Sequence, residues 1–131
     1  MKVAICGKNG FGGREHSIAH LIKHQNPDVE LYLYPGNGGT DELGEHRPAN
    51  NLEEILADMQ ALNIELAIVG PEADLEEGLA DRLRQTGIAC FGPGKEGARL
   101  ETNKLFAKKV LPVPLSPASA VILLDGIPRW I

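Results

Sequence analysis

Glycines are concentrated in four short segments of this chain, and each segment follows a run of aliphatic residues. The segments are Gly7–Gly13, Pro35–Thr40, Gly70–Glu72 and Gly92–Gly94. In an open parallel sheet, small molecules bind beyond the carboxyl ends of the strands. Any one segment alone is better explained by a tight turn. Taken together, the four segments predict a small-molecule site at one edge of a sheet.

The first glycine segment precedes a stretch with helical periodicity, so its backbone amides would form an anion site at a helix N-terminus. Arg14 would add a charged donor for phosphate oxygens. The segment is not a Walker loop, because Gly13-Arg14 stands where that motif has Lys-Ser/Thr. A monophosphate is therefore the favoured anion. From local features alone, Arg14 is interpreted equally well as a solvated helix residue.

The end of the second predicted strand disfavours NAD. Dinucleotide-binding folds place an acidic residue there to hold the ribose, whereas this strand ends in Tyr34-Pro35-Gly36-Asn37. Asn37 and Glu72 are polar residues in the second and third glycine segments, and either could hydrogen-bond sugar hydroxyls or an amine. Glu72 also fits a simpler role, as the carboxylate that begins a helix.

Three histidines recur at every fourth residue and so share one face of a predicted helix: His16, His20 and His24. Zinc would suit such a face. However, Ile18, Leu21 and Ile22 predict a buried face opposite to them, which turns the histidines toward solvent. The glutamate of the metalloprotease helix motif is also missing. We therefore expect no metal site.

The elements that must position these residues alternate along the chain. Strands are predicted at residues 2–6, 29–34, 65–69 and 88–91, and helices at residues 14–24, 52–62, 75–85 and 95–110. The strands lack strict apolar–polar alternation, as expected when helices cover both faces of a parallel sheet. The order predicts an α/β fold, a doubly wound parallel sheet of four or five strands.

The composition fits one globular domain. The chain has 131 residues, of which 43% are hydrophobic and 24% charged, and a single core commonly takes about 100–150 residues. A net charge of −5 disfavours nucleic acid as a partner, and no apolar run reaches the ~20 residues of a membrane span. Cys6 and Cys90 make no disulfide framework, are expected to be buried and inert, and predict a cytoplasmic location.

The last part of the chain has a different character. Prolines at positions 112, 114 and 117 cannot continue a helix, because each lacks a backbone donor. Residues 120–124 could add one further strand. We therefore divide the chain into a domain at residues 1–110 and a Pro-rich tail at residues 111–131.

In their order, the glycine segments resemble one known family. The motifs that carry the resemblance are Gly12-Gly13-Arg14-Glu15-His16, Pro35-Gly36-Asn37-Gly38-Gly39-Thr40, Gly70-Pro71-Glu72-Ala73, Phe91-Gly92-Pro93 and the stretch from Leu100 to Lys108. Over residues 1–110 the chain is similar to the N-terminal part of phosphoribosylamine–glycine ligase, also called glycinamide ribonucleotide synthetase. The resemblance implies a Rossmann-like pre-ATP-grasp domain.

The resemblance also implies a reaction and a site. The family joins glycine to 5-phosphoribosylamine in de novo purine biosynthesis, using ATP. By matching positions, Gly12, Gly13 and Arg14 would face the substrate phosphate, and Glu15 and His16 would support that loop. The remaining substrate-binding positions would be Asn37 and Glu72, facing the ribose or amine, with Gly38, Gly70 and Pro71 beside them.

Two departures from the family bear on function. The first loop is longer than the family's Gly-x-Gly-Gly-Arg-Glu-His through Lys8-Asn9-Gly10-Phe11. The match also stops near Val110, before the ATP-grasp and C-terminal parts that hold ATP, magnesium and glycine in the complete enzyme. Lys104 would lie only at the edge of the ATP site. We therefore expect a truncated ligase that holds no catalytic residue, binds no cofactor and is inactive alone.

Other functions and partners stay open at this point. A stand-alone module that binds a phosphorylated ribose or nucleotide without catalysis is the alternative, whereas an oxidoreductase is disfavoured by the end of the second strand. A lone domain of this family would expose the face that meets the ATP-grasp core. We therefore expect it either to bind the missing domains or to self-associate, and we expect no contact with membranes.

Overall fold

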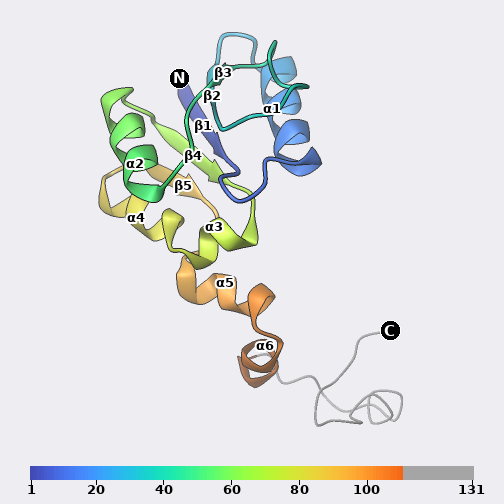
Figure 1. Ribbon diagram of the computed structural model, residues 1–131, viewed down its shortest axis with the longest axis vertical. Coiled ribbons are helices and arrows are strands. Elements are labelled where there is room, and N and C mark those ends of the chain that lie inside the picture. Colours follow the sequence, from blue (N-terminus) through green and yellow to red (C-terminus); the bar gives the residue numbers. More distant parts are fainter. Residues whose placement is uncertain (111–131) are drawn as a thin grey trace.

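A parallel sheet with the strand order β3-β2-β1-β4-β5 organises the computed structural model, which describes residues 1–110 (Figure 1). The strands are β1 (Lys2–Cys6), β2 (Glu30–Tyr34), β3 (Glu45–His46), β4 (Leu66–Val69) and β5 (Ala89–Phe91). The helices are α1 (Gly13–Gln25), α2 (Leu52–Ala61), α3 (Glu72–Glu76), α4 (Leu79–Gln85), α5 (Lys95–Thr102) and α6 (Lys104–Val110). The α/β fold predicted from the sequence is confirmed.

Alternate residues of the central strand β1 enter two separate hydrophobic cores. Ala4 and Cys6 pack into the core shared with α2, α3, α4 and α5. Val3 and Ile5 face the other side of the sheet and pack with Ala19 of α1. Because β1 pairs in parallel with both β2 and β4, its two faces are covered and it carries no polar side chain after Lys2. Helices thus lie on both faces of the sheet (Figure 1).

One strand of the described sheet, β3, was not predicted. It lies at a sheet edge and pairs with Tyr32 and Leu33 of β2. The strand predicted at residues 120–124 lies outside the described residues and stays a prediction. The two residues of β3, Glu45 and His46, are both exposed. An edge strand of this kind carries no apolar pattern, so sequence periodicity could not reveal it.

Two predicted helices are each divided in the structure. The segment expected at residues 75–85 begins earlier, at Glu72, and breaks at Gly78, whose φ of +90° a glycine adopts without strain. The segment expected at residues 95–110 breaks at Asn103. The Asn103 side chain accepts a hydrogen bond from the Phe106 amide at 2.9 Å and so caps α6.

The buried face of α1 agrees with the prediction at Ile18 and Ile22, which pack against the core, and differs from it elsewhere. Leu21 is 53% exposed, whereas Glu15 and Ala19 are buried. The prediction assumed that only apolar residues face the sheet, and a buried carboxylate overturns that assumption. His20 and His24 face solvent with their rings stacked, as expected. Among residues 1–110, no group of three or more His, Cys, Asp or Glu side chains could hold a metal ion.

The two cysteines are not equally buried. Cys6 is completely buried in β1, as expected, whereas Cys90 of β5 is only half-buried because β5 lies at a sheet edge. Removal from water disfavours the thiolate, and the pKa of both thiols is raised by this burial. Neither thiol is therefore activated as a nucleophile.

The long connection between β2 and α2 is held by an ion-paired network. The Tyr34 hydroxyl at the end of β2 donates to Asp58 Oδ2 of α2 at 2.7 Å. Arg47, which follows β3, donates to the same oxygen through Nε at 2.9 Å and to Oδ1 through Nη2. Its remaining amino group pairs with Glu45 at 2.7 Å. The network fixes the ends of residues 35–46, which carry the second glycine segment.

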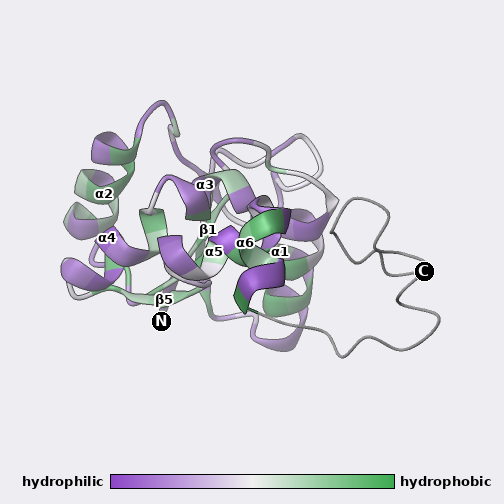
Figure 2. Ribbon diagram, turned by 90° about the horizontal axis from the view of Figure 1, so that it is seen from below, coloured by the Kyte–Doolittle hydropathy of each residue, from purple (hydrophilic) through white to green (hydrophobic). Residues whose placement is uncertain are grey.

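Helices α5 and α6 extend away from the sheet (Figure 1). α6 has no buried residue, and its Leu105 and Val110 are 61% and 49% exposed. Apolar and polar residues alternate along it (Figure 2). No helix within residues 1–110 is long and apolar enough to cross a membrane.

Candidate functional site

Three of the four glycine segments meet at the carboxyl edge of the sheet. They follow β1, β2 and β4, which are neighbours in the strand order. Residues of the first segment and of α1 contact the segments that follow β2 and β4. The fourth segment follows β5, the parallel neighbour of β4; Gly92 lies against Leu75 and Val69, and Gly94 against Asp81.

A buried carboxylate, Glu15, fixes the start of α1. Glu15 is 2% exposed, its Oε2 accepts a hydrogen bond from the Gly12 amide at 2.9 Å, and its Oε1 accepts one from Arg14 Nε at 2.9 Å. Burial opposes ionisation, but these hydrogen bonds outweigh it, so the pKa of Glu15 is lowered. Glu15 is therefore ionised at neutral pH and holds both the loop and the arginine.

Arg14 is held between two carboxylates at the edge of the site. Besides Glu15, its Nη2 lies 3.7 Å from Glu72 Oε2 at the start of α3, and both side chains are about half-exposed, at 51% and 52%. The pKa of Arg14 is raised, chiefly by the hydrogen bond to Glu15. A guanidinium has five N–H donors, so these contacts leave donors for an anion. Glu72 begins α3, as one of its two predicted roles requires, and its pairing with Arg14 was not predicted.

Two glycines are required by close approach of the loops. A Cβ atom on Gly70 would overlap Glu15 Oε1, and one on Gly39 would lie 2.5 Å from Cε1 of the His16 ring. Because the second loop approaches it so closely, the His16 side chain is half-buried. Pro71 is buried and provides the N-cap of α3. Glu15 of α1 thus packs closely against the loop after β4, and His16 of α1 against the loop after β2.

The second loop is closed upon itself by Asn37. Its Oδ1 accepts from the Gly39 amide at 2.9 Å, its own amide donates to Thr40 Oγ1 at 2.9 Å, and its Nδ2 donates to the Phe11 carbonyl at 3.4 Å. Thr40 is completely buried. Sequence reasoning missed the part played by Thr40, although Asn-x-x-Thr is a recognisable turn pattern. Gly38, at the exposed tip of this loop, has open space around it.

Lys104 is not brought to this edge of the sheet. It begins α6, is exposed, and lies beyond α5, away from the carboxyl ends of the strands (Figure 1). Within residues 1–110, the acidic side chains do not gather into a set that fits magnesium. The described residues therefore do not fit a magnesium-bound nucleotide, and we derive no step through one.

What this arrangement can do is bind an anion. The first amides of α1 have no partner within their own helix, and they point to the same edge as Arg14. Backbone donors at a helix N-terminus together with a fixed guanidinium match a phosphate group. Asn37 and Glu72 add polar groups on either side, from the neighbouring loops. The arrangement thus brings a fixed guanidinium, the N-terminus of α1 and two polar side chains to one edge of the sheet, a combination that suits an anion such as phosphate.

Comparison with known proteins identifies relatives of this chain. Residues 1–101 match the family model described as "Phosphoribosylglycinamide synthetase, N domain". A phosphoribosylamine–glycine ligase of Clostridium acetobutylicum is 41% identical over 111 residues, covering 82% of this chain and 26% of the relative. The trifunctional purine biosynthetic protein adenosine-3 of Chironomus tentans is 40% identical over 106 residues, covering 76% of this chain and 8% of the relative.

A solved structure shows the same fold. The crystal structure of phosphoribosylamine–glycine ligase from Thermotoga maritima superimposes with a TM-score of 0.62 at 32% sequence identity, covering 83% of this chain and 24% of that chain. This chain therefore spans about a quarter of the length of the single-function relatives that it matches.

Proposed function

Since the chain belongs to the phosphoribosylglycinamide synthetase N-domain family, we propose that it forms the phosphoribosylamine-binding part of an ATP-dependent ligase. The ligase joins glycine to 5-phosphoribosylamine in de novo purine biosynthesis. The observation that carries the proposal is Arg14, held by Glu15 and Glu72 beside the first amides of α1. A fixed cation next to free backbone donors suits the 5-phosphate.

Each loop has a part in this site. Gly13 and Arg14 bind the phosphate beside Gly12, whose amide donates to Glu15, and Glu15 and His16 hold the loop that presents them. Asn37 and Gly38 from the loop after β2 face the ribose. On the other side, Glu72 faces the ribose or the amine, and it is placed there by Gly70 and Pro71. The half-exposed Arg14–Glu72 pair leaves both side chains accessible to a ligand.

ATP and magnesium belong to the complete enzyme, bound by segments that follow the matched region in the longer relatives. The chain alone binds neither, and Lys104 touches only the edge of the nucleotide site. It supplies no catalytic residue and carries out no ligation by itself. The protein acts in the cytoplasm. Its partner is a small phosphorylated sugar.

Ligand protection of the folded chain tests this proposal. Glycinamide ribonucleotide, NAD and ATP are each added in separate thermal unfolding experiments. Saturation at about 100 times the Kd adds about 2.7 kcal/mol to the free energy of unfolding, and we expect this only for glycinamide ribonucleotide. Protection by NAD alone would overturn the proposal.

Substitution of the phosphate clamp gives the specific test. Arg14→Ala removes charge-assisted hydrogen bonds worth about 1.5–3 kcal/mol, so the Kd for glycinamide ribonucleotide should rise about 10- to 100-fold. The matched control is Arg82→Ala, a surface arginine of α4 paired with Glu53. Isothermal titration should find the control unchanged. Equal affinity of Arg14→Ala and the unaltered chain would refute the clamp.

A stand-alone binding module is the second candidate, because the pairing of Arg14 with Glu15 and Glu72 at the start of α1 suits any phosphorylated ribose or nucleotide. Such a module would bind a phosphorylated ribose or nucleotide without catalysis. The source DNA beyond the codon for Ile131 distinguishes the two candidates. ATP-grasp coding sequence downstream in any frame supports the ligase, and its absence supports the module.

Exposed apolar side chains of β5 and α6 predict association. Phe91 is 72% exposed at the end of β5, and Leu105 and Val110 of α6 are 61% and 49% exposed. In the complete ligase, these side chains meet the ATP-grasp core; in the lone chain, they promote self-association. Sedimentation velocity should show the average mass rising with concentration. Replacing Phe91 and Leu105 by Ser should reverse the rise, and a monomer at every concentration would contradict it.

A further inference from the structure

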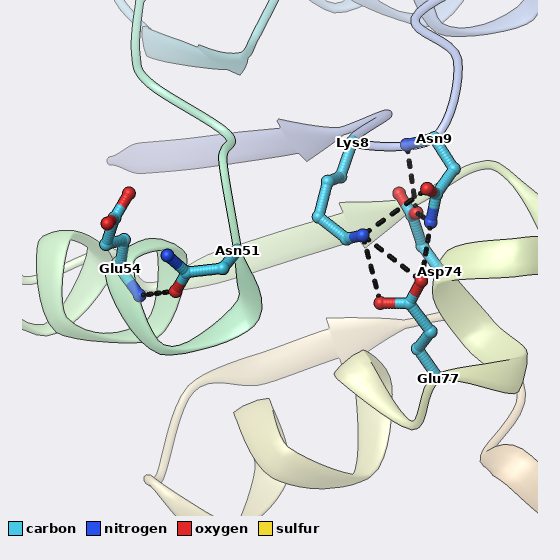
Figure 3. A network of polar contacts seen from close by, with 6 residues as sticks. All are labelled: Lys8, Asn9, Asn51, Glu54, Asp74 and Glu77. Carbon is cyan, nitrogen blue, oxygen red and sulfur yellow. Dashed lines mark hydrogen bonds and ion pairs between the residues drawn. The ribbon is translucent and has the colours of Figure 1, made fainter.

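The longer first loop is tied to α3 at its beginning. The Asn9 amide donates to Asp74 Oδ1 at 3.1 Å, and its Nδ2 donates to the same oxygen at 2.6 Å. Asn9 Nδ2 also reaches Glu77 at 3.0 Å, and Lys8 Nζ forms an ion pair with Glu77 at 3.0 Å. Figure 3 shows the Lys8 and Asn9 side chains directed toward the two carboxylates. Lys8 and Asn9, two of the residues that lengthen the loop, are therefore engaged in one polar cluster.

Asp74 is the buried centre of this cluster. It is completely buried, and its second oxygen, Oδ2, has no hydrogen-bond partner among the described residues. Burial raises the pKa of this carboxyl, against the hydrogen bonds from Asn9 and Lys8 that lower it. A carboxyl in such a place destabilises the fold unless its contacts compensate. The contacts that it makes are with the first loop.

One short helix thus holds the first loop at both ends. At the end of the loop, Glu72 pairs with Arg14 at 3.7 Å. At its beginning, Asp74 of α3 accepts hydrogen bonds from Asn9, and Glu77, the residue that follows α3, pairs with Lys8. Between these ends lie Gly10 to Gly13, whose amides precede and open α1. A segment rich in glycine loses much conformational freedom when it is fixed, so its geometry depends on these two attachments.

We propose that Asp74 is a positioning residue, which fixes the longer first loop through Asn9 and thereby places the start of α1, with Gly13 and Arg14, toward the phosphate. The inference rests on the proposed function, because the phosphate is the ligand assigned above. Asp74 itself touches no ligand: it acts through Asn9. The extra residues of the loop are accordingly a structural support of the site, and they do not block it.

Two variants of the full chain test the proposal, each with two readouts. Asp74→Ala removes the acceptor, and Asn9→Ala removes the side-chain donor at an exposed position, where the fold is retained. The first readout is limited trypsin cleavage after Lys8, whose side chain is 13% exposed. The second is the Kd for glycinamide ribonucleotide. Glu76→Ala, an exposed change on the same helix, is the matched control, and Asp74→Asn keeps an acceptor oxygen.

We expect faster cleavage after Lys8 and about tenfold weaker binding in Asp74→Ala and Asn9→Ala. Glu76→Ala and Asp74→Asn should match the unaltered chain. Unchanged affinity in both alanine variants, or unchanged cleavage after Lys8, would overturn the proposal. If the unaltered chain binds no glycinamide ribonucleotide while Lys8 becomes cleavable in the variants, the proposed function fails and the loop-fixing role of Asp74 stands.

Discussion

Asp58→Ala should reduce the free energy of unfolding by about 3 kcal/mol, among the largest losses expected from one surface-accessible carboxylate. Asp58 accepts hydrogen bonds from Tyr34 at 2.7 Å and from Arg47 at 2.9 Å. Its removal leaves the hydroxyl of the completely buried Tyr34 without this partner and a guanidinium that is only 27% exposed without its main counter-ion. Urea denaturation measures the loss.

The pH dependence of this loss identifies its ionic origin. The hydrogen bond from Arg47 is the largest influence on Asp58 and lowers its pKa, with burial opposing and Tyr34 adding to the effect. A lowered pKa in the folded state contributes stability that is complete above the unfolded value of about 3.9 and is lost as pH falls through the folded value. The difference between the unaltered chain and Asp58→Ala should therefore shrink below about pH 4.

A surface pair provides the control for Asp58. Glu53→Ala breaks the Glu53–Arg82 contact, in which both side chains are exposed, and should change stability little. A loss in Asp58→Ala as small as that in Glu53→Ala would show that the network does not anchor the connection between β2 and α2. A difference that stays constant down to pH 2 would show that the interaction is not ionic.

Gly70→Ala should both destabilise the fold and weaken ligand binding. The new Cβ atom would overlap the Glu15 carboxylate, which is buried and has little room to move. Displacing it breaks the hydrogen bonds to the Gly12 amide and Arg14 Nε, both 2.9 Å long. Overpacking and the lost hydrogen bonds together should cost about 2–4 kcal/mol of unfolding free energy.

A double-mutant cycle tests the cause of the Gly70 effect. If the added methyl group acts by displacing Glu15, then Gly70→Ala should cost much less in a chain that already carries Glu15→Ala. Denaturation of the four proteins measures the coupling, and titration with glycinamide ribonucleotide measures the matching loss of affinity. Additive effects of the two substitutions would mean that Gly70 is needed for a reason other than its contact with Glu15.

The amino-acid sequence by itself determined the α/β class and the edge of the sheet at which the glycine segments lie. Aliphatic runs such as residues 2–6 and 65–69 can be satisfied only by burial on both faces, and this requirement is local and easily read. A glycine segment after each strand then has to lie at one edge, because parallel strands end on the same side. Arg14, Glu72 and Asn37 could be singled out for the same reason.

Only the tertiary structure decided which of these side chains meet and which polar groups are buried. Asp74 looks like an ordinary surface carboxylate in the sequence, yet it is buried, because a donor distant in the chain satisfies it. This pairing joins residues that are 65 positions apart, Asn9 and Asp74. Periodicity records the average polarity of a face, and a buried polar contact is an exception to that average. The contact between Asp74 and the first loop was for this reason invisible before the fold, whereas the glycines, Arg14 and Glu15 could be named from the sequence.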